Sequence, residues 1–132
     1  MKATVTWQAD MRFVGKTDNG KTLEMDGDSD SNAVTPMESV LIAVGACSSI
    51  DVVDILKKSR QEVSHCVCEL SAEIAENAPR FFTAIHAHYI VQGDKVSEKH
   101  VRRAVQLSVE KYCSVMLMLE KNIAITTSFV IL

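Results

Sequence analysis

The sequence predicts a single domain of the α+β class, and three observations support this. The chain has 132 residues, the size of one average domain. Its 47% hydrophobic and 23% charged residues are typical of a soluble globular protein. The expected elements follow the order βββ-α-ββ-α-α-β, in which strands and helices are grouped rather than alternating. That order argues against a doubly wound nucleotide-binding fold.

Three short strands are expected at the N-terminus. Residues 2–7 alternate apolar and polar side chains, and residues 11–14 form a second short strand. The sequence Asp18-Asn19-Gly20 predicts a tight turn, because Asn-Gly tolerates positive φ at both central positions. Residues 22–25 then form the returning strand, and the polar residues 26–32 form a loop.

A long buried helix is expected from Pro36 to about Ser59. Thr35 can cap its first turn, Pro36 suits the first helical position, and Glu38 stands where a capping-box carboxylate reaches back. Residues 40–47 are apolar all round, which is typical of a buried helix. Because apolar side chains cover more than one face of this helix, one small sheet cannot bury them all. The sequence therefore predicts an obligate homodimer.

The remaining elements are two strands, two helical segments and a last strand. Residues 66–76 and 80–92 form the expected strand pair. Ser97 is a plausible cap for the second helix, and residues 111–121 add a further helical turn or two. The β-branched segment 123–131 forms the last strand.

Net charge and composition limit the classes of binding partner and the cellular location that are expected. The formal net charge of −3 argues against a nucleic-acid or membrane-surface binder, since both favour a basic face. No apolar run approaches the roughly 18 to 20 residues that cross a bilayer. Residues 1–7 lack the apolar stretch of a secretion signal. A cytoplasmic protein is expected, in which the four cysteines are thiols rather than structural disulfides.

A zinc site is not expected, although Cys66, Cys68, His86 and His88 have the residue types for one. Alternation places both cysteines on the apolar face of their strand. On the next strand the apolar face includes Phe81, and both histidines lie on the other side. The four side chains therefore point to opposite faces of the sheet.

Cys47 and Cys113 are the candidate reactive residues. Each lies in an apolar, helical stretch, far from the other in sequence. One interpretation is two small buried hydrophobic side chains. The other is a redox pair, in which one thiolate attacks and the other thiol resolves the sulfenic acid. Asp51, one helical turn after Cys47, would raise the pKa of a thiol, so an activating Arg or Lys must come from elsewhere.

The segments Thr35-Pro36-Met37-Glu38-Ser39-Val40-Leu41, Gly45-Ala46-Cys47-Ser48 and Lys111-Tyr112-Cys113-Ser114-Val115 carry a family resemblance. With them the chain resembles the OsmC/Ohr family of osmotically induced and organic hydroperoxide resistance proteins, most closely its YhfA-like branch. The resemblance covers essentially the whole chain. It implies an OsmC-like fold, an intertwined homodimer with long central helices packed between antiparallel sheets.

The resemblance also implies a function, thiol-dependent reduction of organic hydroperoxides in oxidative stress defence. Cys47 would attack the peroxide and Cys113 would resolve, without a bound cofactor or metal. An external dithiol, such as a lipoyl protein, would be the reductant. The alternative is a non-catalytic dimer of the same fold that binds a small apolar ligand.

Three positions depart from the family pattern. Met37 stands where the family peroxidases have Glu, and Glu38 comes one residue later. Arg12 is the only Arg before the long helix and is the candidate for holding the thiolate. Ser114 follows the second cysteine in place of the usual Pro. The supporting candidates are therefore Arg12, Glu38 and Asp51.

Overall fold

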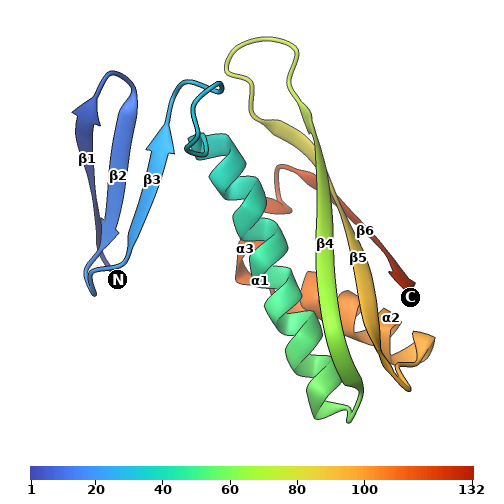
Figure 1. Ribbon diagram of the computed structural model, residues 1–132. Coiled ribbons are helices and arrows are strands. Elements are labelled where there is room, and N and C mark those ends of the chain that lie inside the picture. The colour runs from blue at the N-terminus through green and yellow to red at the C-terminus, as the bar shows by residue number, and fades with distance from the viewer. The chain divides into compact units, whose positions relative to one another are not determined.

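The structure is a computed structural model that describes residues 1–132. It divides into two compact units, Met1–Val40 and Leu41–Leu132. The N-terminal unit contains an antiparallel sheet in the order β1-β2-β3 (Figure 1), formed by β1 (Ala3–Ala9), β2 (Arg12–Thr17) and β3 (Thr22–Asp26).

A turn joins the second and third strands as predicted, but positive φ is found only at Gly20, at 87°, and not at Asn19. Glycine adopts this conformation without steric cost. After β3 the chain loops back, and the Asp26 N–H donates to the carbonyl of Val34 at 3.0 Å. This bond fixes the start of the segment that leads into the long helix.

The long helix α1 (Pro36–Lys58) begins where the sequence predicts. The N–H of Glu38 donates to Oγ1 of Thr35 at 3.2 Å, so Thr35 caps the first turn. By length and composition alone α1 could cross a membrane, as could the core helices of many soluble proteins. The expectation that no segment is long enough to cross a bilayer therefore holds only for an uninterrupted run of apolar residues.

One stripe of α1 is buried against the sheet of the C-terminal unit. Its buried residues include Val44, Ser48, Val52 and Leu56, spaced by four residues, as expected for one helical face. Gly45 lies on the same side, where a Cβ would meet Cδ1 of Leu70 at 2.5 Å. The glycine therefore allows α1 to approach the sheet closely.

The C-terminal sheet has the order β4-β5-β6, formed by β4 (Glu62–Ile74), β5 (Phe82–Asp94) and β6 (Ala124–Ile131). The first two strands are antiparallel, but β5 and β6 are parallel. The expectation of purely antiparallel sheets is therefore wrong for this sheet. A parallel pair requires a long crossover, and the helical segments between residues 98 and 119 supply it.

A bulge changes the predicted face of the first β5 residues. Glu73 pairs with Ala84, whereas Ile74 pairs with Phe82, so β5 has one extra residue at this point. The bulge turns Phe82 toward the core, where it is buried. Phe81 is 56% exposed, so its prediction as a core residue is wrong.

The crossover contains α2 (Glu98–Leu107), a π-helical turn η1 (Ser108–Tyr112) and α3 (Ser114–Leu119). Ser97 caps α2 as predicted, because its side chain accepts the N–H of His100. The sequence predicts one helical segment over 111–121, but the helix is interrupted at Cys113. This residue is extended, with φ −71° and ψ 101°.

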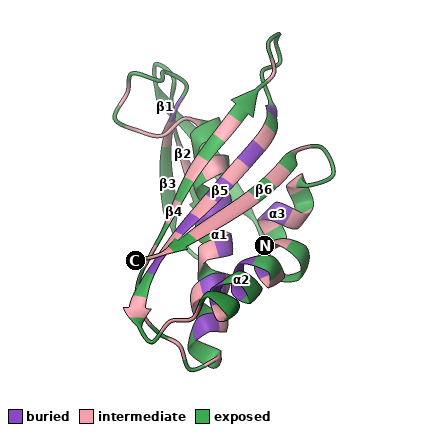
Figure 2. Ribbon diagram, turned by 90° about the vertical axis from the view of Figure 1, so that its right-hand side faces the viewer, coloured by how far each residue is buried: buried purple, intermediate pink, exposed green.

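One core lies between this sheet and all three helices. Residues of β5 that share a face are buried together with residues from α1, α2 and α3, so the helices cover the same side of the sheet. Figure 2 shows these buried positions along β5 and the inner faces of α1 and α2. The five residues of β5 are Phe82, Ile85, Ala87, Tyr89 and Val91.

Candidate functional site

The two predicted thiols meet in this core. Cys47 lies half-buried on α1, and Cys113 is fully buried between η1 and α3. Both are free cysteines. The pKa of Cys113 is raised to about 11, mainly by burial, and the neighbouring Cys47 and Asp51 contribute to the shift. The structure therefore brings together three of the candidate site residues, Cys47, Cys113 and Asp51.

The two thiols have different environments. Cys113 occupies the N-cap of α3, where its Sγ accepts the N–H of Met116 at 3.4 Å. That bond favours the thiolate, but burial outweighs it. At neutral pH, Cys113 is therefore a thiol placed next to the sulfur of Cys47.

A buried hydrogen-bond network extends behind the thiols. The Tyr89 hydroxyl donates to Oγ of Ser48 at 2.7 Å, and Ser48 donates to the carbonyl of Val44 at 2.9 Å. The Ser108 hydroxyl donates to Oδ2 of Asp51 at 3.0 Å. Burial raises the pKa of Tyr89, which keeps its hydroxyl protonated as a donor. These side chains connect α1 to β5 and to η1.

Sequence reasoning missed Ser48, Tyr89 and Ser108 as site residues. One signal was available for Ser48, a polar residue in the middle of an apolar helix and in register with its buried stripe. A buried polar side chain of this kind requires a partner. The Ser48 hydroxyl accepts from Tyr89, 41 residues away, and the Ser48 backbone carbonyl accepts from Ser108, 60 residues away; no local pattern indicates either contact.

The other two supporting candidates lie in the N-terminal unit. The Arg12 guanidinium pairs with Glu24 at 3.6 Å and with Asp26 at 3.8 Å. Within this unit its charge is therefore offset by two carboxylates. Glu38 is exposed in the first turn of α1, where its negative charge interacts favourably with the positive end of the helix dipole.

The second pair of cysteines lies on the core side of β4. Cys66 pairs with Val91 and Cys68 with Tyr89, both on the buried face of β5. Burial raises the pKa of both thiols, and no cation contributes to either shift. Neither thiol therefore has the nearby positive charge that activates a nucleophile, and the same is true of Cys113.

The two histidines of β5 face away from this core. His86 hydrogen-bonds to Thr126 at 2.7 Å and to Ser128 at 2.8 Å, and His88 to Ser128 at 2.7 Å. The predicted separation of the histidines from Cys66 and Cys68 is therefore confirmed. No cluster of three or more His, Cys, Asp or Glu side chains is arranged to hold a metal ion.

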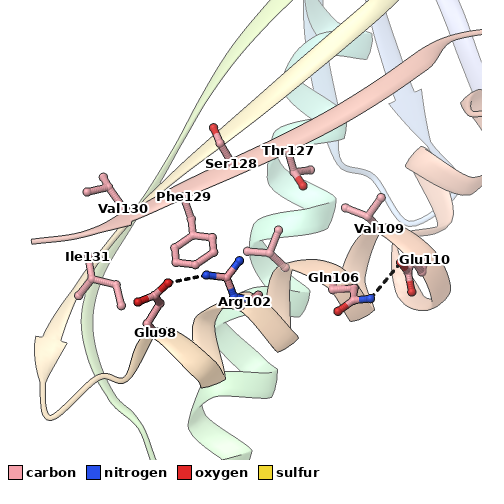
Figure 3. A pocket seen from close by; sticks show the side chains of 11 residues that line it. Glu98, Arg102, Gln106, Val109, Glu110, Thr127, Ser128, Phe129, Val130 and Ile131 are labelled. Atoms are coloured by element: carbon pink, nitrogen blue, oxygen red, sulfur yellow. Dashed lines mark hydrogen bonds and ion pairs between the residues drawn. The ribbon is translucent and has the colours of Figure 1, made fainter.

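A cavity of about 780 Å³ lies elsewhere, along α2 and β6. Figure 3 shows that its polar side chains pair with one another, Arg102 with Glu98 and Gln106 with Glu110. The Arg102 guanidinium also lies over the ring of Phe129, 5.4 Å from its centre. Since no thiol lines this cavity, size alone does not identify the reactive site.

Comparison with known proteins identifies relatives of the whole chain. The family model described as OsmC-like protein matches residues 27–128. The chain is 50% identical to protein YhfA of Escherichia coli K12 over 129 residues, which cover 98% of this chain and 96% of the relative.

Solved structures have the same fold. A hypothetical protein from Aquifex aeolicus VF5 superposes with a TM-score of 0.89 at 33% identity, over 99% of this chain and 95% of the other. The organic hydroperoxide resistance protein OhrB of Bacillus subtilis superposes with a TM-score of 0.68 at 14% identity, over 98% of both chains. At that identity the likeness shows a common fold.

Proposed function

The chain belongs to the OsmC family, and on that premise we propose that it reduces organic hydroperoxides with Cys47 and Cys113. The observation that carries the proposal is the asymmetry of the two thiols. Cys113 is fully buried and burial raises the pKa of its thiol, whereas Cys47 is only half-buried. A hydroperoxide can reach the more accessible of the two thiols, so we assign Cys47 as the attacking residue and Cys113 as the resolving one.

The first step oxidises Cys47. Its thiolate attacks the terminal oxygen of the hydroperoxide, the O–O bond breaks, and the alkoxide leaves and takes up a proton to become an alcohol. Cys47 becomes a sulfenic acid. Cys113 then loses its proton and attacks the Cys47 sulfur, and the S–O bond breaks. The hydroxide leaves as water, and a Cys47–Cys113 disulfide remains.

Regeneration requires two electrons from outside the chain. An external dithiol, such as the dihydrolipoyl group of a protein, would exchange with the disulfide and return both cysteines to thiols. No metal or organic cofactor takes part in this scheme. We place the reaction in the cytoplasm, where such reductants keep thiols reduced.

We also propose that the active form is a homodimer, in which each α1 is covered by the partner chain. Ile42 and Ile50 on α1 are 54% and 69% exposed, outside the stripe that packs on the sheet. In the N-terminal unit, Trp7 is 63% exposed on a strand with no buried residue. Several large apolar side chains exposed to solvent are typical of a protein interface rather than of a free surface.

The experiment that tests the proposed function is oxidation of the reduced, untagged protein by cumene hydroperoxide, followed by counting of free thiols. We expect loss of two of the four thiols per chain, in step with the consumption of one peroxide. A Cys66→Ser variant is the matched control, because it removes a half-buried thiol outside the pair and should react at the wild-type rate. Four unchanged thiols after a large excess of peroxide would instead favour binding of an apolar ligand without catalysis.

A further inference from the structure

Ser108 connects the helix that carries Cys47 to the segment that carries Cys113. It is fully buried, and its hydroxyl proton is shared between Oδ2 of Asp51 at 3.0 Å and the carbonyl of Ser48 at 3.3 Å. Its own carbonyl accepts the backbone N–H of Cys113 at 2.8 Å. One residue therefore joins the turn of α1 just after Cys47 to the backbone of Cys113.

The bond between Cys113 and the Ser108 carbonyl closes the π-helical turn η1. Such turns are rare and are frequent at functional sites. Here the wide turn ends the helical run immediately before Cys113, which adopts an extended backbone and caps α3. The fully buried side chain of Cys113 then lies against Cys47. A regular α-helical turn would not make this five-residue bond.

The titratable groups that act on Cys113 are Asp51 and Cys47, both on α1, and burial raises the pKa of Cys113 more than either of them. The Ser108 hydroxyl donates to Oδ2 of Asp51 at 3.0 Å, so Asp51 also fixes Ser108. No cation contributes to the shift of Cys113. A fixed negative charge beside a buried thiol opposes its ionisation.

We propose that Ser108 and Asp51 are positioning residues for the second step of the thiol reaction, an inference that rests on the proposed function. Ser108 holds the backbone of Cys113 within reach of oxidised Cys47, and Asp51 fixes Ser108 by accepting the hydrogen bond of its hydroxyl. When the disulfide forms, the proton of Cys113 and the hydroxide of the sulfenic acid leave together as water. Neither residue touches the peroxide.

The test follows both steps after reduced protein is mixed with cumene hydroperoxide. Sulfenic acid on Cys47 is trapped with dimedone, and the disulfide is followed by mass. In Ser108→Ala we expect the first step at the wild-type rate and disulfide formation slowed about ten- to a hundredfold, because small displacements cost that much in rate. Ser114→Ala is the matched control, since Ser114 is exposed next to Cys113 and should change neither step.

Asp51→Asn and Asp51→Ala separate the hydrogen bond from the charge. Asparagine keeps an acceptor oxygen for Ser108, so disulfide formation should stay near the wild-type rate, whereas alanine removes the acceptor and should slow this step as Ser108→Ala does. Equal rates in the two variants would overturn the role of Asp51, and this comparison decides the matter alone if Ser108→Ala does not fold.

The outcomes distinguish the inference from the proposed function. A wild-type disulfide together with a wild-type rate in Ser108→Ala overturns the inference and leaves the proposed function intact. A wild-type protein that forms neither sulfenic acid nor disulfide overturns both. Accumulated sulfenic acid in Ser108→Ala and in Asp51→Ala, with a near-wild-type rate of disulfide formation in Asp51→Asn, supports the inference.

Discussion

The hydrogen bond between Tyr89 and Ser48 provides a quantitative test of the network behind the thiols. Both residues are fully buried, and the Tyr89 hydroxyl donates to Oγ of Ser48 at 2.7 Å. In Tyr89→Phe this bond is lost, but Ser48 keeps its own bond to the carbonyl of Val44. Loss of one neutral hydrogen bond, with one oxygen lone pair left without a partner, should lower the free energy of unfolding by about 1 to 2 kcal/mol.

Removal of the acceptor in place of the donor should lower the free energy of unfolding at least as much. Ser48→Ala leaves the Tyr89 hydroxyl buried without its acceptor, which costs about 1 to 3 kcal/mol. The double variant removes both partners of the bond, so its loss should be smaller than the sum of the two single losses. The expected coupling free energy is about 1 kcal/mol, within the range measured for residues in one network.

The assay is urea denaturation of the four proteins at one fixed protein concentration, because dimerisation would make stability depend on concentration. Tyr112→Phe is the control, since Tyr112 is exposed and its loss should change stability by less than about 0.5 kcal/mol. Single losses that add to within about 0.5 kcal/mol in the double variant would show that the two side chains do not interact.

Four further predictions concern the sheet, the thiols, pH and assembly. Gly93→Ala should destabilise the protein strongly in thermal melts, because a Cβ would lie 2.1 Å from the carbonyl oxygen of Glu62; a wild-type melt would contradict the β4–β5 register. Cys47→Ser should abolish peroxide reduction, whereas Cys113→Ser should complete one turnover and stall as a trappable sulfenic acid. An unfolded thiol ionises near 9.0 and Cys113 in the fold near 11, so the free energy of unfolding should fall as pH rises between these values. Cys113→Ala should weaken that fall, and an unchanged slope would contradict the burial of this thiol. The melting temperature should rise with protein concentration, and a constant value with a monomer in sedimentation would refute the dimer.

Local chemistry allowed several elements to be predicted from the sequence. Thr35 and Pro36 mark the start of α1, and Ser97 marks the start of α2, because caps act on the residues next to them. The alternation in β4 and β5 separates Cys68 from His88 correctly, since side chains in a strand alternate between faces. In these cases, the information needed lies within a few residues.

Other features depend on contacts between distant residues. The parallel pairing of β5 with β6 is set by the path of the crossover, and the bulge that buries Phe82 instead of Phe81 is set by pairing with β4. The π-helical turn depends on Ser108, whose partners lie 57 and 60 residues away. The periodicity over 111–121 predicts a helix there, but it carries no sign of the interruption at Cys113.

Mapping of the disulfide formed by a single equivalent of hydroperoxide tests the central claim most directly. The reduced protein is oxidised, free thiols are blocked, and the cross-linked peptides are identified by mass spectrometry without reduction. We predict one intramolecular disulfide between Cys47 and Cys113, with Cys66 and Cys68 recovered as blocked thiols. A disulfide that joins Cys66 or Cys68, or recovery of all four cysteines as thiols, would contradict the assignment of the reactive pair.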